Sequence, residues 1–300
     1  MYKLRFPKFS LRTLIIVISI LGIGFAVYGN YFSQVIRQKR MIAWVQRNQG
    51  SFMYNDSIID IGSVPPPPKL LDLFVDDFIS TINGIDLSYK QVDDLTLLSS
   101  LDQIKYARLN NTLVNDLSAL SGLKELQTIF LDNSPVDDLS PLSNLEHLRM
   151  LSLSGTHVTD LSPLSNLTKI ELLYLEGTQI TDLTPIQNFS DLELLICNNT
   201  PISDLSPLSQ LDNLSVLYLS NTKVSDLSPL RHLTDLSYIN LENTPVTDLK
   251  PLYKAGCHLL TLRGCKISEA EIKAFEAAVP DCKILRPNDP LPVPFKLIFP

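Results

Sequence analysis

The chain has 300 residues, of which 45% are hydrophobic, and a formal net charge of −7. This composition is sufficient for one elongated domain and a membrane anchor. We expect no nucleic-acid partner, because a phosphate backbone attracts a basic surface and this chain is acidic.

The amino terminus combines a basic stretch with a long run that carries no charge. Residues 1–12 contain four Lys and Arg residues, and residues 13–36 contain no charged residue. As an α-helix the second run would span about 36 Å, which exceeds a hydrocarbon core of about 30 Å. We therefore expect a basic cytoplasmic tail at 1–12 and one transmembrane helix at 13–36.

A cleavable signal peptide is the alternative for this segment, with Gly24–Ala26 as a weak cleavage site. Uncharged residues continue beyond Ala26 as far as Ile36, which favours a retained anchor. Charge does not decide the orientation, because residues 37–47 are basic as well. We expect the amino terminus in the cytoplasm and the remainder of the chain on the non-cytoplasmic side.

Residues 37–68 are expected to form a membrane-proximal helix followed by a proline-rich spacer. In this helix Ile42 and Val45 lie close to one apolar face. Trp44, the single tryptophan, is expected to pack on another part of the chain. A short strand is predicted within 49–56. The four consecutive prolines at 65–68 then favour a stiff, extended linker over a ligand for adaptor domains.

Aspartates recur every 22 residues through most of the remaining chain. From Asp138 the sequence reads Asp-Leu-Ser-Pro-Leu-Ser-Asn-Leu-x-x-Leu-x-x-Leu-x-Leu, and Asp160 starts the pattern again. The other aspartates in phase are Asp72, Asp94, Asp116, Asp182, Asp204, Asp226 and Asp248. A fixed period of roughly 20 to 29 residues with L-x-x-L-x-L in each unit is typical of leucine-rich repeats. The predicted fold is an α/β repeat: a leucine-rich repeat solenoid with a parallel sheet on the concave face, preceded by one transmembrane helix.

Each unit also indicates its local structure. In Leu151-Ser152-Leu153 the alternation has the period of a strand, with the leucines in the core. Ser140-Pro141 favours a short helix or 3₁₀ segment capped by the serine hydroxyl. The leading aspartates are expected to bond backbone amides of the turn, a structural role and not a catalytic one. A column of hydroxyl residues is expected to satisfy further backbone groups: Thr112, Ser134, Thr156, Thr178, Thr200, Thr222 and Thr244.

Over roughly residues 72–268 the D-L-S-P-L-x-x-L-x-x-L-x-x-L-x-L-x-x-T-x-V units resemble the 22-residue bacterial leucine-rich repeats of the internalin type. Residues 9–14, with the apolar run behind them, resemble the short anchor of a family of bacterial membrane proteins that carry leucine-rich repeats. The resemblance implies a protein-binding role without identifying the ligand.

The solenoid needs a cover at each end, because otherwise its core would be exposed there. An N-terminal cap with a degenerate repeat is expected at 69–93, and the leucine-rich repeats at 94–268. Ser268 is predicted to cap a helix that opens the C-terminal cap at 269–286, in which residues 283–285 can add a last strand. A proline-rich tail follows at 287–300.

No pattern of residues predicts catalysis. The sequence lacks a C-x-x-C or H-x-x-x-H metal motif, a nucleophile elbow and a phosphate-binding glycine loop. We expect no enzyme activity, no cofactor and no metal. Cys197 occupies a core strand position, whereas a bridge across the rear cap, either Cys265–Cys282 or Cys257–Cys282, remains open if the domain is exported.

The outward positions of the predicted strands carry the strongest functional signal. Neighbouring strands lie about 4.8 Å apart, so outward residues of successive units form one continuous face. Exposed apolar and aromatic faces usually mark interaction sites, although this one could instead serve packing. The concave patch, as we call the predicted ligand-binding residues, comprises Phe130, Met150, Leu172, Tyr174, Leu194, Ile196, Val216, Tyr218 and Tyr238, and its acidic margin comprises Asp132, Glu176 and Glu242.

The predicted function is that of a membrane-anchored protein–protein interaction module, which binds an unknown protein or a surface polymer through the concave leucine-rich repeat face. The alternative is a structural or accessory subunit whose concave patch is buried in a permanent assembly. The two hypotheses differ in whether the patch is free in the purified protein.

Overall fold

The computed structural model describes residues 40–54, 57–59 and 82–286. The expected transmembrane helix at 13–36, the proline tract and the tail at 287–300 lie outside these residues. Within the described part of the chain, no helix is long and apolar enough to cross a membrane.

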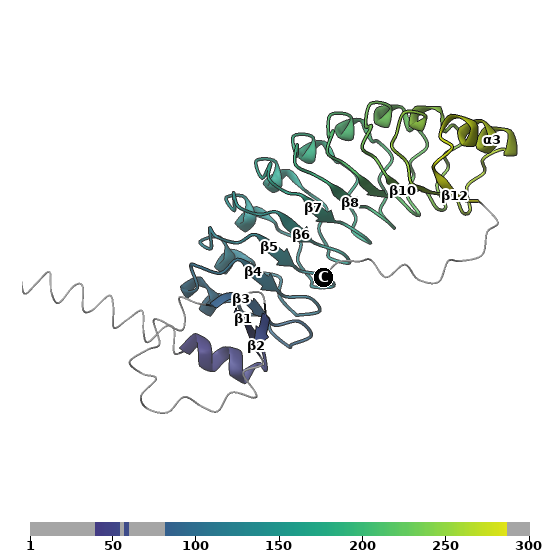
Figure 1. Ribbon diagram of the computed structural model, residues 1–300. Helices are drawn as coiled ribbons and strands as arrows, with labels where there is room; N and C mark the ends of the chain where they lie inside the picture. Colours follow the sequence, from purple (N-terminus) through teal and green to yellow (C-terminus); the bar gives the residue numbers. More distant parts are fainter. Residues whose placement is uncertain (1–39, 55–56, 60–81, 287–300) are drawn as a thin grey trace, which may run out of the picture.

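The described residues form an arc of stacked coils, with strands on the inner side and short helical turns on the outer side (Figure 1). The strands make one 12-stranded sheet in the order β2-β1-β3-β4 and onward to β12. From β3 to β12 every neighbouring pair is parallel and in register, which confirms the predicted parallel sheet. The strands are β1 (Ser51–Tyr54), β2 (Ser57–Ile59), β3 (Ile82–Asp86), β4 (Tyr106–Arg108), β5 (Thr128–Phe130), β6 (Met150–Ser152), β7 (Leu172–Tyr174), β8 (Leu194–Ile196), β9 (Val216–Tyr218), β10 (Tyr238–Asn240), β11 (Leu259–Thr261) and β12 (Lys283–Leu285).

From β3 to β11, the outer side of each coil is a short 3₁₀ segment. The turns are η3 (Thr96–Ser100), η4 (Ser118–Leu120), η5 (Ser140–Leu142), η6 (Ser162–Leu164), η7 (Thr184–Ile186), η8 (Ser206–Leu208), η9 (Ser228–Leu230) and η10 (Lys250–Leu252). The expected serine cap is wrong, because the hydroxyl of Ser140 does not cap η5. Instead Asp138 Oδ1 accepts the backbone N–H of Ser140 at 2.8 Å, which confirms the structural role of the aspartates.

One apolar core runs through all the coils. Leu151 and Leu153 are fully buried, as the alternation predicts, and they belong to a continuous cluster that extends from the first described helix to the last strand. The hydroxyl column lies beside this core. Thr156 Oγ1 donates to the carbonyl of Leu153 at 2.6 Å, and Thr178 repeats the bond to Leu175 at 2.7 Å. The predicted backbone role of the column is therefore confirmed.

The front of the core is covered by a helix at residues 40–47 and by β1. Met41 and Val45 of this helix are fully buried, and Trp44 packs partly buried against the same cluster. β1 lies within the predicted 49–56 stretch and pairs antiparallel with β3. This reversal ends the series of parallel coils.

The rear of the core is covered by α3 (Glu269–Ala278) and β12. Ser268 Oγ accepts the backbone N–H of Glu271 at 3.2 Å, which confirms the predicted helix cap. Phe275 is fully buried on the core side of α3. Of the two bridges left open by the sequence, the structure forms Cys257–Cys282, which ties β12 to the preceding coil.

Candidate functional site

The register of the sheet brings the predicted patch residues into two adjacent columns. Met150, Leu172, Leu194, Val216 and Tyr238 pair directly with one another across β6 to β10. The second column runs two residues further along each strand: Phe130, Ser152, Tyr174, Ile196 and Tyr218. The concave patch therefore exists as one surface on the inner side of the arc.

Exposure within the patch is uneven. Tyr238 is 41% exposed, and most other members are half-buried, whereas Leu194 and Ile196 are only 2% and 5% exposed. Ile196 pairs between Tyr174 and Tyr218, and the larger tyrosine side chains on both sides shield it. These two residues were expected to contact a ligand, but their side chains form the floor of the patch.

The two central tyrosines are held in a partly dry environment. Burial raises the pKa of Tyr174, and the neighbouring charge of Asp132 raises it further. Burial also raises the pKa of Tyr218, with a smaller effect from Tyr238. Both hydroxyls are therefore protonated at neutral pH and offer a donor beside an apolar ring, the combination that makes tyrosine a frequent interface anchor.

The acidic margin is mostly engaged within the protein. Asp132 accepts hydrogen bonds from the Ser152 hydroxyl and, at 3.1 Å, from the Ser154 backbone N–H. Burial raises the pKa of Asp132 in spite of these bonds. Glu242 pairs with Arg263 at 3.4 Å.

Glu176 is the exposed member of the margin. Its carboxylate accepts a hydrogen bond from Asn199 Nδ2 at 3.2 Å. The three residues thus differ in role, and only Glu176 presents a largely solvated charge beside the patch.

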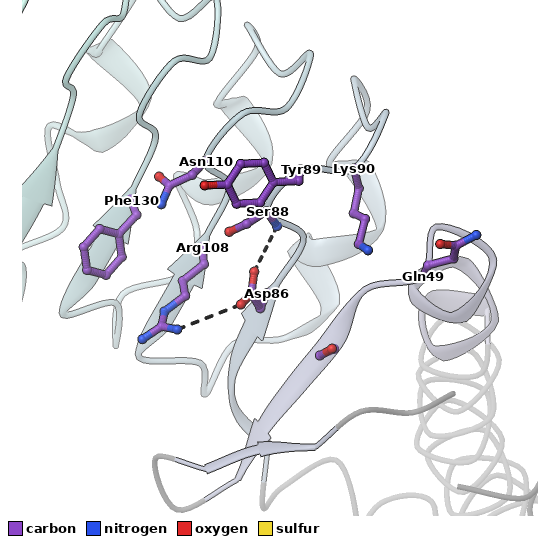
Figure 2. A pocket seen from close by; sticks show the side chains of 9 residues that line it. Gln49, Asp86, Ser88, Tyr89, Lys90, Arg108, Asn110 and Phe130 are labelled. Atoms are coloured by element: carbon purple, nitrogen blue, oxygen red, sulfur yellow. Dashed lines mark hydrogen bonds and ion pairs between the residues drawn. The ribbon is translucent and has the colours of Figure 1, made fainter. Parts of the chain in front are cut away.

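A pocket that sequence reasoning missed lies at the N-terminal end of the inner face. It has a volume of about 460 Å³ and is lined by Gln49, Ser51, Asp86, Ser88, Tyr89, Lys90, Arg108, Asn110 and Phe130 (Figure 2). Arg108 and Asp86 approach to 3.9 Å, and the Arg108 guanidinium lies 5.7 Å from the centre of the Phe130 ring. The sequence did indicate a polar site here, because the column of solvent-facing strand residues starts with Asp86 and Arg108 and becomes apolar only at Phe130.

The described residues contain no group of three or more His, Cys, Asp or Glu side chains that could hold a metal ion. The leading aspartates of the units stay apart on the outer side of the coils. For Asp138 and Asp160 the hydrogen bonds from the following serine hold the carboxyl pKa below its usual value. Such a spacing positions turns and does not assemble a reactive centre.

The sequence matches a family model described as leucine-rich repeats (2 copies) over residues 146–188, 190–232 and 212–254. No protein with curated annotation matches it. Among solved structures, an internalin C2 from Listeria monocytogenes is 26% identical, with a TM-score of 0.60 over 63% of this chain and 82% of that chain.

Two further structures share the fold at lower identity. A leucine-rich repeat protein of Leptospira interrogans is 21% identical, with a TM-score of 0.58 over 69% of this chain and 62% of that chain. The leucine-rich repeat ectodomain of the Arabidopsis thaliana membrane receptor kinase GASSHO1/SCHENGEN3, solved in complex with CASPARIAN STRIP INTEGRITY FACTOR 2, is 23% identical. Its TM-score is 0.54 over 61% of this chain and 24% of that chain. Residues 146–188 and 190–254 therefore match leucine-rich repeats in sequence, and the described solenoid has the leucine-rich repeat fold, which commonly serves as a protein–protein interaction module.

Proposed function

We propose that this chain is a membrane-anchored interaction protein that binds a protein or a surface polymer through the concave patch. The observation that carries the proposal is the row of half-buried tyrosines and aliphatic side chains along β6 to β10. A row of this kind offers a partner apolar area together with hydroxyl donors.

The solenoid supports this role through rigidity. The strands under the patch pair in parallel without a register shift, and their core-facing side chains are fully buried. Because Tyr174 and Tyr218 stand on this fixed sheet and are already half-buried, they lose little conformational freedom when a partner binds. A preformed patch of this type favours recognition without a large rearrangement.

The membrane part of the proposal depends on the sequence. The uncharged run at 13–36, with its basic flanks, is long enough to span a bilayer as a helix. If the amino terminus lies in the cytoplasm, as we propose, such an anchor places the repeats on the non-cytoplasmic side, where a protein or a polymer of the cell surface is available as a ligand.

The test compares the full chain in detergent with the double variant Tyr174→Ser/Tyr218→Ser, first by sedimentation and then by capture of partners from a membrane and envelope extract. Leu113→Ser is the matched control, because Leu113 is 51% exposed and lies outside the concave patch. We expect a monomeric parent that retains a partner, a control that retains it equally, and a double variant that loses it. For two interface tyrosines the expected loss of affinity is about thirtyfold, which corresponds to about 2 kcal/mol.

Two results would contradict the proposal. If the parent self-associates and the double variant does not, the patch is an assembly surface and the structural-subunit alternative is correct. If the monomeric parent and the double variant retain the same components, the tyrosine row does not bind the partner.

A further inference from the structure

Tyr89 occupies a backbone position that suits a different residue. At the equivalent place in the next seven coils the chain has a left-handed residue that is always Asn or Gly: Asn111, Asn133, Gly155, Gly177, Asn199, Asn221 and Asn243. Tyr89 has φ of 62°, and its backbone N–H donates to the Asn110 carbonyl at 2.8 Å, so it adopts the same turn. A bulky side chain in this conformation is strained, and such strain tends to occur at functional sites.

Packing does not explain the tyrosine. Its side chain is 76% exposed, the largest exposure among the large hydrophobic residues of the described chain. Because the ring stabilises neither its own backbone nor the core, we look for its role in the pocket that it borders. Figure 2 shows the ring of Tyr89 at the rim of the pocket, close to Ser88 and Asn110.

The pocket holds an arginine that is positioned but incompletely paired. Asp86 is the carboxylate partner of Arg108 within the described residues, and the 3.9 Å separation is at the long limit for an ion pair. One oxygen of Asp86 already accepts the Ser88 backbone N–H at 2.9 Å. Phe130 supports the guanidinium from one side. A guanidinium has five donors in a fixed fork, so most of this fork is available to a ligand.

The charges in the pocket indicate the class of ligand. Arg108 and Lys90 are cationic and Asp86 is anionic, which leaves one excess positive charge on the lining of an otherwise acidic chain. A single carboxylate balances this excess of one charge, whereas a phosphate dianion exceeds it and is repelled more strongly by Asp86. The ring of Phe130 lies beside Arg108, and the ring of Tyr89 adds apolar area near Ser88 and Asn110.

We propose that this pocket binds a carboxylate side chain of an acidic peptide, with Arg108 as the bidentate partner, Lys90 as a further positive charge of the lining, and Tyr89 packing on the apolar residue next to the acid. The pocket continues the column that leads through Phe130 to Tyr174, so the peptide segment is taken to belong to a protein partner of the concave patch. In this respect the inference rests on the proposed function, but its test uses the pocket alone.

The experiment measures binding of two isosteric peptides to the full chain in detergent by saturation-transfer NMR. The probes are N-acetyl-Phe-Glu-amide and N-acetyl-Phe-Gln-amide, which differ in charge and not in shape. We expect the Glu peptide to bind at least about tenfold more tightly, because a hydrogen-bonded ion pair replaces a neutral contact. Added salt should weaken binding of the Glu peptide and leave binding of the Gln peptide unchanged.

Three variants assign the residues. Arg108→Gln should abolish the preference for Glu. Arg149→Gln, which removes an arginine that directly precedes β6 and pairs with the carboxylate of Glu171, should retain it. Tyr89→Asn should weaken binding of the Glu peptide by about tenfold. The same variant should raise the melting temperature of the protein, because Asn is tolerated in the left-handed region. A tyrosine with only a structural role would not combine higher stability with weaker binding.

The proposal is overturned if neither peptide binds, if the two bind equally, or if folded Arg108→Gln keeps the preference. It is also overturned if Tyr89→Asn leaves binding unchanged. These outcomes are independent of partner capture by the concave patch, so the pocket and the proposed function can fail separately.

Discussion

At the residue scale, equivalent positions of successive coils use either an amide or a carboxylate oxygen to accept a backbone N–H of the next coil. Asn110 Oδ1 accepts the backbone N–H of Asp132 at 2.9 Å, and Asn198 Oδ1 accepts that of Ser220 at 2.8 Å. Asp132 does the same for Ser154 with a carboxylate oxygen. All three side chains link one coil to the next, but only Asp132 carries a charge that burial disfavours, which its raised pKa records.

We therefore expect Asp132→Asn to stabilise the fold at pH 7, by about 1 kcal/mol. Ser152 and Ser154 both donate to Oδ1 of Asp132, so the amide oxygen of Asn can keep both hydrogen bonds. Since the folded-state pKa of Asp132 lies above the unfolded value, the folded protein binds the proton more tightly. The wild type therefore regains stability as the pH falls through that raised pKa.

Urea denaturation at pH 7 and near pH 4 checks both parts of this expectation. The advantage of the variant should shrink at the lower pH, because the raised pKa of Asp132 makes the wild-type carboxyl take up its proton more readily in the folded protein. A variant that is less stable than the wild type at pH 7 would show that the charge-assisted bond from Ser152 outweighs the cost of burial.

At the element scale, the C-terminal cap is held by a side chain cap, a covalent bridge and buried apolar contacts. Ser268 begins α3, Ile272 and Phe275 of this helix are buried, and Cys257–Cys282 closes a segment with a sequence separation of 25. Arg286, directly after β12, pairs with Glu269 and Glu276 at 2.6 Å each. These exposed pairs contribute little compared with a bridge that limits the unfolded chain.

Reduction of the bridge is expected to destabilise the cap by about 3 kcal/mol. Dithiothreitol should speed amide exchange in α3 and β12 of the wild type and of Cys265→Ser, since Cys265 is a free thiol. The double variant Cys257→Ser/Cys282→Ser should exchange quickly with or without the reductant. If the wild type is insensitive to dithiothreitol while the bridge is shown to be reduced, the cap is held by its apolar contacts alone.

The strands and turns were predictable because the period of 22 residues fixes the register before any contact is known. β7 and β8 illustrate this, since the alternation of Leu173 and Leu195 with outward residues is visible in the sequence. Exposure was less predictable, because it depends on the size of neighbours in other coils, as for Ile196 between two tyrosines. The pocket was missed for a similar reason: its lining joins Gln49 and Ser51, from outside the repeats, to the first coils.

At the scale of the whole molecule, the protein is a linear array in which a coil contacts mainly the coils beside it. Its core is continuous, and each end is covered by a helix: residues 40–47 at the front and α3 at the rear. In such an array the stability is close to a sum of repeat and interface contributions, so the effect of a cavity depends on its position. A central cavity weakens two interfaces that join long segments, whereas a terminal cavity weakens only the last coils.

Leu173→Ala in β7 and Leu260→Ala in β11 test this dependence, because both leucines are fully buried strand residues. Each loss should cost about 2–5 kcal/mol locally. For Leu173→Ala we expect amide exchange to rise most in β6 to β8 and to decline toward both caps, with two unfolding transitions in urea. For Leu260→Ala the rise should be confined to β10, β11 and the C-terminal cap. Equal increases along the whole chain in both variants would mean that the repeats unfold as one cooperative unit, in which case a ligand at the N-terminal pocket would stabilise the distant C-terminal cap as strongly as its own coils.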